Sequence, residues 1–170
     1  MVDSKNLHIA NYHKFYIQTS TDTSAVDTRA SFGMIAKVNP FPLLPNAKAP
    51  YKNDWLDENG EEEYVFSMHY EAIEFSVGFF VRTVGTTSAK TIHTWVDSFF
   101  AKVKQGYFKT FDESTGIGFQ NVRYVGYKED SFLEGGKGSE HFTQSVFTIT
   151  FKANDPVTRM KLNNGSIVTE

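Results

Sequence analysis

The sequence contains no cysteine, and this absence removes several kinds of chemistry at once. A chain without thiols has no disulfide framework, no thiolate ligands for zinc, haem or iron–sulfur clusters, and no cysteine nucleophile. It also needs no oxidising compartment in order to fold. The composition therefore excludes the small disulfide-stapled folds and every site built on cysteine ligands.

A surplus of positive charge is also missing. The chain has 17 Lys plus Arg against 20 Asp plus Glu, which gives a formal net charge of −3. Proteins with general affinity for nucleic acids neutralise phosphates with a basic surface. We therefore expect no such affinity here, and no sequence-specific nucleic-acid partner.

Long apolar segments are absent as well. The run Phe79-Phe80-Val81 is typical of the longest in the chain, far below the ~20 residues that a membrane-spanning helix needs. The first six residues lack the apolar core of a signal peptide. These features predict a soluble protein that is made in the cytoplasm and has no membrane partner.

The common motifs of enzymes and metal sites are missing too. The five histidines include no His-Glu-x-x-His pair, and no Gly-x-Ser-x-Gly segment marks a hydrolase nucleophile. The glycine-rich residues 135–139 lack the spacing of a phosphate-binding loop. The acidic residues around Asn59-Gly60 do not fit the twelve-residue calcium loop. We therefore expect no catalytic residue, no cofactor and no metal ion, and histidines that lie on the surface.

Aromatic residues, by contrast, are plentiful: they make up 15% of the chain, with 16 Phe and 8 Tyr. Aromatic side chains favour strands and bury large areas. Apolar residues alternate on even positions over 64–70 and on odd positions over 73–81, so a bulge or break is predicted near Glu71-Ala72. Further strands are predicted at residues 8–18, 32–38, 107–111, 117–127 and 142–152. The last of these ends at Asp155-Pro156.

One segment has the helical period instead of the strand period. Its apolar positions follow i, i+3, i+4, i+7, i+8 and i+11: Ile92, Trp95, Val96, Phe99, Phe100 and Val103. This stripe predicts an amphipathic helix over about 88–105, capped by Thr87 or Ser88 and followed by Gly106. Strands, a single helix and strands again indicate an α+β, mainly β fold, namely an antiparallel β-sandwich or barrel with one flanking helix and long extended loops.

The length of 170 residues predicts a single domain over 1–170. Residues 19–27 and 130–140 are polar and lack a period, so we expect a loop and a flexible tip. Residues 157–170 are predicted to be a polar C-terminal tail. Residues 40–63 hold four of the five prolines and form a long irregular connection, which usually has a function in a compact domain. We predict that this extended arm packs on a neighbouring subunit.

The stretch from Asp54 to Pro156 resembles structural proteins of bacteriophage tails. The residues that carry the resemblance are the acidic turn at 54–60, the strand around Phe75-Ser76-Val77-Gly78-Phe79, the helix around Trp95, residues 108–112 with the Gly116-Ile117-Gly118 turn, and the closing segment 147–156. In the tail-tube-like families (tube proteins, distal tail proteins and tail terminators), a β-sandwich or barrel carries one flanking helix. The final strand ending near Asp-Pro resembles distal tail proteins in particular.

This resemblance implies a non-enzymatic virion protein that forms a ring, of six subunits, within a phage tail. Its partners would be further copies of itself and other tail or neck proteins, and it would be made in the cytoplasm of the host bacterium. The candidate subunit-interface residues are Tyr51, Trp55, Leu43, Leu44 and Phe132. The candidates for an acidic lumen, which would let DNA slide by like-charge repulsion, are Asp57, Glu58, Glu61, Glu62 and Glu63.

Two alternatives stay open. A tail terminator, a neck ring protein or a contractile injection-system subunit would share the same fold. A carbohydrate-binding β-sandwich belongs to a different class, and there Tyr51 and Trp55 would stack on sugar rings. Ring assembly favours the tail protein, whereas a monomer that binds a glycan favours the carbohydrate-binding module.

Overall fold

The computed structural model describes residues 3–5, 14–37, 44–53, 62–64 and 68–170. Most of the described chain is antiparallel strand, so the predicted α+β, mainly β class is confirmed. In chain order the elements are β1 (Phe15–Thr19), β2 (Val26–Asp27), α1 (Thr28–Phe32), β3 (Ile35–Lys37), β4 (Tyr51–Asn53), β5 (Glu62–Tyr64), β6 (Ile73–Val84), α2 (Ser88–Val103), β7 (Phe108–Asp112), β8 (Ile117–Gly135), the 3-10 turn Gly138–Glu140, β9 (Phe142–Asn163) and β10 (Ser166–Thr169).

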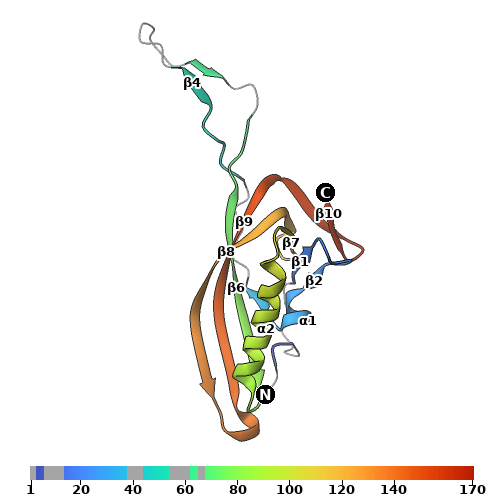
Figure 1. Ribbon diagram of the computed structural model, residues 1–170, viewed down its shortest axis with the longest axis vertical. Coiled ribbons are helices and arrows are strands. Elements are labelled where there is room, and N and C mark those ends of the chain that lie inside the picture. Colours follow the sequence, from blue (N-terminus) through green and yellow to red (C-terminus); the bar gives the residue numbers. More distant parts are fainter. Residues whose placement is uncertain (1–2, 6–13, 38–43, 54–61, 65–67) are drawn as a thin grey trace.

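Eight of these strands form one sheet in the order β2-β1-β7-β8-β9-β6-β3, with β10 paired to β9 beside this path (Figure 1). The odd-position alternation predicted for 73–81 is confirmed, because Ile73, Phe75, Val77, Phe79 and Val81 are all buried. β4 and β5 make a separate two-stranded sheet. The predicted break near Glu71-Ala72 is also present, since β6 begins at Ile73.

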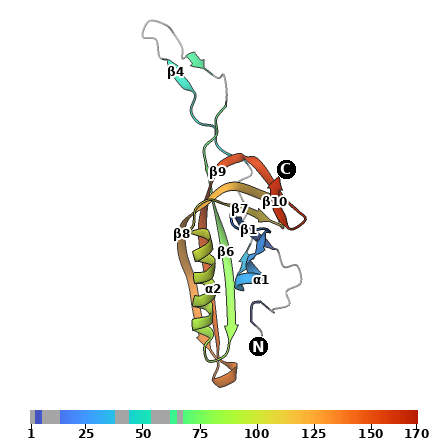
Figure 2. The same ribbon diagram turned by 45° about the vertical axis from the view of Figure 1, so that its right-hand side comes forward.

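The large sheet folds over so that two of its parts face each other across one core. The long strands β8 and β9 bend as they cross the molecule (Figures 1 and 2). Phe15 on β1 packs 6.0 Å from Phe79 on β6 and 6.3 Å from Phe151 on β9, measured between ring centroids. β1 is linked to β6 in the sheet through β7, β8 and β9. One continuous sheet therefore achieves the packing of a sandwich.

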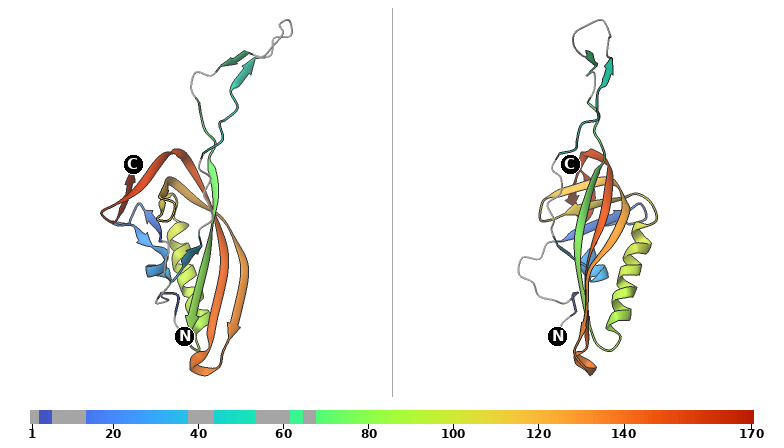
Figure 3. Two further views of the ribbon diagram at one scale, coloured as in Figure 1. Left: turned by 180° about the vertical axis from the view of Figure 1, so that it is seen from behind. Right: turned by 90° about the vertical axis from the view of Figure 1, so that its left-hand side faces the viewer.

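The predicted amphipathic helix is confirmed as α2. Both helices lie on the same side of the β6–β9–β8 part of the sheet (Figure 3). The Phe99 ring contacts Phe32 of α1 at 5.5 Å and Phe79 of β6 at 5.9 Å. Ile92 and Val103 are buried on the same stripe. Burial of each of these side chains stabilises the fold by roughly 1.5–3 kcal/mol.

The start of α2 differs from the prediction. Thr87 is the N-cap residue but makes no side-chain cap bond. Ser88 is 1% exposed, and its Oγ lies 2.6 Å from Thr143 Oγ1 and 3.0 Å from His141 Nδ1. The hydroxyl is therefore committed to tertiary partners on β9 and just before it. As a result His141, expected on the surface, lies in a part-buried hydrogen-bond network.

The short helix α1 was not predicted. Its N-cap Asp27 accepts a hydrogen bond from the backbone N–H of Arg29 at 2.9 Å, and Gly33 ends it with φ of 64°. Five residues are too few to show a helical period, so these two cap residues were the available sequence signal.

Gly33→Ala is expected to lower the free energy of unfolding by about 2–3 kcal/mol. A Cβ at this position would lie 2.4 Å from Cζ3 of Trp95, and the φ of +64° is strained for any side chain. Urea denaturation measures the change. Gly126→Ala is the matched control, since no atom lies within 4 Å of its Cβ position, and an equal loss in both variants would contradict the contact with Trp95.

The C-terminal end corrects two predictions. The last strand does not end at Asp155-Pro156, and residues 157–170 are not a polar tail: β9 runs to Asn163 and returns as β10. In the β8–β9 ladder, Gln120 pairs with Asp155 and the preceding residue, Phe119, pairs with Arg159, so residues 156–158 of β9 form a bulge. Pro156 lies in this bulge, where its missing N–H breaks no ladder bond. The two-residue turn Asn164-Gly165, with φ of 47° and 78°, closes the hairpin as Asn-Gly turns commonly do.

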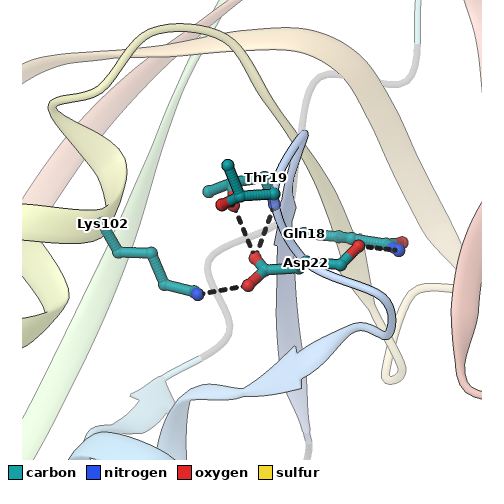
Figure 4. A network of polar contacts seen from close by, with 5 residues as sticks. Gln18, Thr19, Asp22 and Lys102 are labelled. Carbon is teal, nitrogen blue, oxygen red and sulfur yellow. Dashed lines mark hydrogen bonds and ion pairs between the residues drawn. The ribbon is translucent and has the colours of Figure 1, made fainter.

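A polar network joins the β1–β2 turn to the end of α2 (Figure 4). Asp22 Oδ2 accepts hydrogen bonds from the Thr19 N–H at 2.8 Å and the Thr19 hydroxyl at 2.7 Å. Asp22 Oδ1 forms an ion pair with Lys102 Nζ at 2.5 Å. Burial alone would raise the pKa of Asp22, but the hydrogen bonds from Lys102 and Thr19 outweigh burial and lower it.

Asp22→Ala is expected to cost about 1–2 kcal/mol of stability at neutral pH, because hydrogen bonds to a charged group are lost. The folded-state pKa is lowered, so this contribution is complete above the unfolded pKa of about 3.9 and is lost as the pH falls through the folded value. Denaturation curves of the variant and the parent should therefore differ at pH 7, and the difference should become smaller at pH 3. Asp97→Ala, at an exposed position of α2, is the control, and a pH-independent difference would contradict the network.

Candidate assembly surfaces

Within the arm, the described strands β4 and β5 form a small ribbon that stands away from the body of the protein (Figure 1). At its root, the Lys48 N–H donates to His69 O and the Glu71 N–H donates to Asn46 O, both at 2.8 Å. Farther out, β4 and β5 pair with each other and with no other strand of the described chain. A small two-stranded sheet is marginal in water by itself. The arm is therefore a segment that contact with another surface would stabilise.

A long unpaired strand edge is the second feature. One edge of β8 pairs with β9 from Gly118 to Gly135. The other edge pairs with β7 only as far as Val122. From Arg123 to Gly135, no strand of the described residues covers the other edge of β8. Unprotected edges of this kind are templates for pairing with another chain.

The last part of this edge, residues 130–135, was predicted to belong to a flexible tip over 130–140, and for these residues the prediction is wrong. β8 continues to Gly135, so residues 130–135 are strand and the tip is confined to the turn before β9. The hairpin is held by ladder pairs such as Phe132 with Ser145 and Gly135 with Phe142. The segment therefore presents its backbone in an ordered strand geometry.

Apolar side chains are exposed along the same edge: Val125, Tyr127, Phe132 and Leu133 are 40%, 51%, 47% and 52% exposed. The Tyr127 ring also packs 5.5 Å from the core ring of Phe147. A row of half-exposed apolar residues beside an open backbone edge is typical of an association surface rather than of a free surface.

The predicted interface residues are not brought together. Leu44 is 82% exposed at the arm root, whereas Phe132 lies near the β8–β9 turn at the opposite end of the molecule. Tyr51 lies in β4, and Leu43 and Trp55 fall outside the described residues. Of the acidic lumen candidates, Glu62 and Glu63 lie in β5, and the other three, Asp57, Glu58 and Glu61, also fall outside the described residues.

Apolar residues missed by the sequence reading surround Leu44. Together with Pro45, Tyr70, Pro156, Val157 and Arg159 it lines a cleft of about 380 Å³ between the arm root and the β9 bulge. Tyr70 and Val157 are 37% and 58% exposed. Val157 lies in the β9 bulge, so no alternation marked it in the sequence, whereas Tyr70 ends the alternation predicted over 64–70.

The described residues offer no arrangement that points to metal or acyl-transfer chemistry. No group of three or more His, Asp or Glu among them could hold a metal ion. Ser88 and His141 are within hydrogen-bond distance, but Ser88 is 1% exposed and its Oγ also contacts Thr143. A substrate could not reach that hydroxyl. No helix in the part of the chain that the structure describes is long and apolar enough to cross a membrane.

Comparison with known proteins adds a likeness of fold. The sequence matches no protein-family model and no curated protein. Among solved structures, it is similar to the Dit protein (gp 19.1) of SPP1, described as a paradigm of the hub adsorption apparatus in phages that infect Gram-positive bacteria. The TM-score is 0.54 at 12% identity, over 87% of this chain and 52% of that one. The chain thus spans about half the length of Dit, and the resemblance to phage tail proteins expected from the sequence is met at the level of the fold.

Proposed function

We propose that this chain is a non-enzymatic structural subunit of a phage tail, distal-tail-like, which assembles into a ring of six identical copies in the virion. The single observation that carries the proposal is the open edge of β8 with its exposed apolar residues. The likeness of fold to a tail hub protein supports the same role. A ring would cover this edge in every copy.

A complementary edge lies on the far side of the sheet. Through the ladders, Arg123 and Tyr127 of β8 are level with Glu74 and Val77 of β6. Among the described residues, no strand pairs with the outer edge of β6 over 73–77, since β3 begins to pair at Gly78. Both β8 and β6 are antiparallel to β9, so copies related by rotation about the strand direction would present them as parallel neighbours.

Charge fits this lateral contact. Arg123 stands at the start of the open β8 segment and Glu74 at the start of the open β6 segment, at the same level of the sheet. Opposite charges across an interface set its register and speed association. In a cyclic ring, every copy would use β8 on one side and β6 on the other, which is a head-to-tail contact that closes by rotation.

Native mass spectrometry and negative-stain images of one purified sample test the proposal. We expect masses of six subunits and ring-shaped particles. A protein that stays monomeric at every concentration and binds sugars in a glycan screen would overturn the ring and favour the carbohydrate-binding module.

A further inference from the structure

A polar cleft of about 270 Å³ lies where the end of β1 and the turn after it meet the starts of β7 and β8. Most of its lining consists of amide, hydroxyl and charged side chains, and Tyr107 adds an exposed aromatic ring. Pockets for drug-sized ligands begin at about 300 Å³. The size of this cleft therefore suits one small ligand.

Three long polar side chains of the cleft are fixed by contacts with the last two strands. Gln18 Oε1 accepts a hydrogen bond from the Ile167 N–H at 2.7 Å, and Lys109 Nζ donates to Ile167 O at 3.1 Å. Gln120 Nε2 donates to Asp155 Oδ2 at 2.5 Å. Contacts of this kind hold a site in one geometry before a ligand arrives, which lowers the entropy cost of binding.

The charged groups of the cleft already have partners. The carboxylate of Asp22 forms its ion pair with Lys102 (Figure 4), and the ammonium group of Lys109 is held by a backbone carbonyl. By contrast, no described residue supplies a hydrogen-bond partner to the side chain of Ser20 or of Asn121, and both residues are exposed. The groups that remain to bind a ligand are therefore neutral donors and acceptors.

Asn121 is placed beside the cleft by an irregularity of β8. The β7–β8 ladder shifts between Phe108 and Thr110, so Lys109 alone faces both Gln120 and Asn121. The φ of Asn121 is 52°, in a region that few non-glycine residues adopt. The other described non-glycine residue with positive φ lies in the β9–β10 turn, which requires it, whereas Asn121 lies within a strand. Bulges and left-handed residues of this kind re-aim side chains at functional sites.

Tyr107 gives the cleft an aromatic wall just before β7. Its side chain is 58% exposed, and its hydroxyl oxygen accepts a hydrogen bond from Asn154 Nδ2 at 3.0 Å. A sugar ring matches this combination of groups, because it has an apolar C–H face that packs on an aromatic ring and a rim of hydroxyls that need hydrogen-bond partners. A charged ligand would find no unpaired opposite charge there.

We propose that this cleft binds one ring of a neutral saccharide, which stacks on Tyr107 and forms hydrogen bonds with Ser20 and Asn121. The inference goes beyond the proposed structural role and does not depend on it. The lining of the cleft ends at Asn121, and the open β8 edge begins at Arg123. A subunit within a ring could therefore hold the sugar as well as a free monomer.

Ligand-observed NMR titrations of the whole chain test the site. The probes are the methyl glycosides of glucose, galactose, mannose and N-acetylglucosamine, with glucuronate and adenosine for comparison. Tyr107→Ala removes the stacking ring, and Asn121→Gly removes the amide but keeps a residue that adopts positive φ readily. The matched controls are Tyr70→Ala, at an exposed tyrosine outside the cleft, and Asn164→Gly, at the other left-handed asparagine.

At least one methyl glycoside is expected to bind, and each site variant should weaken its binding about fivefold or more, while both controls bind it as the parent does. Equal binding by all four variants would place the sugar elsewhere and overturn the site. Failure of every methyl glycoside to bind would overturn it as well. Tighter binding of glucuronate or adenosine than of any methyl glycoside would overturn the neutral saccharide as the ligand.

Native mass spectra of the same samples keep this inference separate from the proposed ring. Ring masses without sugar binding would overturn the saccharide site alone. Sugar binding at the cleft by a protein that stays monomeric at every concentration would overturn the ring alone.

Discussion

Val125→Lys is expected to raise the protein concentration needed for ring assembly by about tenfold or more, while leaving the fold intact. Val125 is 40% exposed and lies in the register shift between Tyr124 and Gly126 of β8. Its replacement therefore breaks no pair with β9. A lysine on an open edge opposes addition of another strand, and a penalty of about 1.4 kcal/mol per contact is already a factor of ten.

The effect should exceed this single-contact figure because every subunit of a closed ring carries the substitution. A dilution series followed by native mass spectrometry gives the assembly threshold directly. Thr169→Lys provides the matched control: it places the same charge at an exposed position of β10, a strand that pairs with β9 and lies off the main path of the sheet. Equal thresholds for the two variants would remove the β8 edge from the lateral interface.

Phe79→Ala is expected to cause the largest loss of stability, about 3–5 kcal/mol. Phe79 is fully buried, and its ring lies 6.0 Å from Phe15 on β1, 5.9 Å from Phe99 on α2 and 5.8 Å from Phe147 on β9. The phenyl ring thus joins both parts of the folded sheet to the helix. Its removal leaves a cavity that none of the three neighbours can fill alone.

Urea denaturation of the monomeric protein measures this loss as a lower midpoint with an unchanged slope. Phe100→Ala is the control, because it removes the same ring from a position that is 40% exposed and packs on Tyr124. A loss for Phe79→Ala no greater than that for Phe100→Ala would show that the two parts of the sheet do not depend on this ring.

The regular periods in the sequence were sufficient to predict α2 and the core face of β6. Ile92, Phe99 and Val103 repeat at the helical period, and Phe75 and Phe79 lie on the same alternating face of the strand, so local geometry alone places them on buried faces. Both elements are long enough for the pattern to be distinct. For the same reason α1, with five residues, escaped prediction.

β8 shows where the pattern fails. Tyr124, Tyr127 and Phe132 pair with Phe151, Ile149 and Ser145, all on the buried face of β9. They are not spaced by two, because bulges after Tyr124 and Glu129 each add one residue and reverse the face. The segment therefore reads as irregular in the sequence although its partner strand is regular.

The candidate surfaces were predictable only in part. The prolines and apolar residues of 40–63 predicted an arm, and Phe132, which was predicted as an interface residue, is 47% exposed. That Phe132 lies on an ordered open edge, level with a β6 segment already covered by Ser4 and β3, follows from pairings between residues far apart in the chain. No local pattern records such pairings.

The sequence by itself determined the mainly β class, the amphipathic helix and the absence of cysteine chemistry, because each depends on composition or on a period along the chain. The tertiary structure decided which edges of the sheet are covered and which remain open. Edge coverage depends on bulges and on long-range partners such as β3 and the residues around Ser4, and these are set by packing of the whole chain rather than by any segment of it.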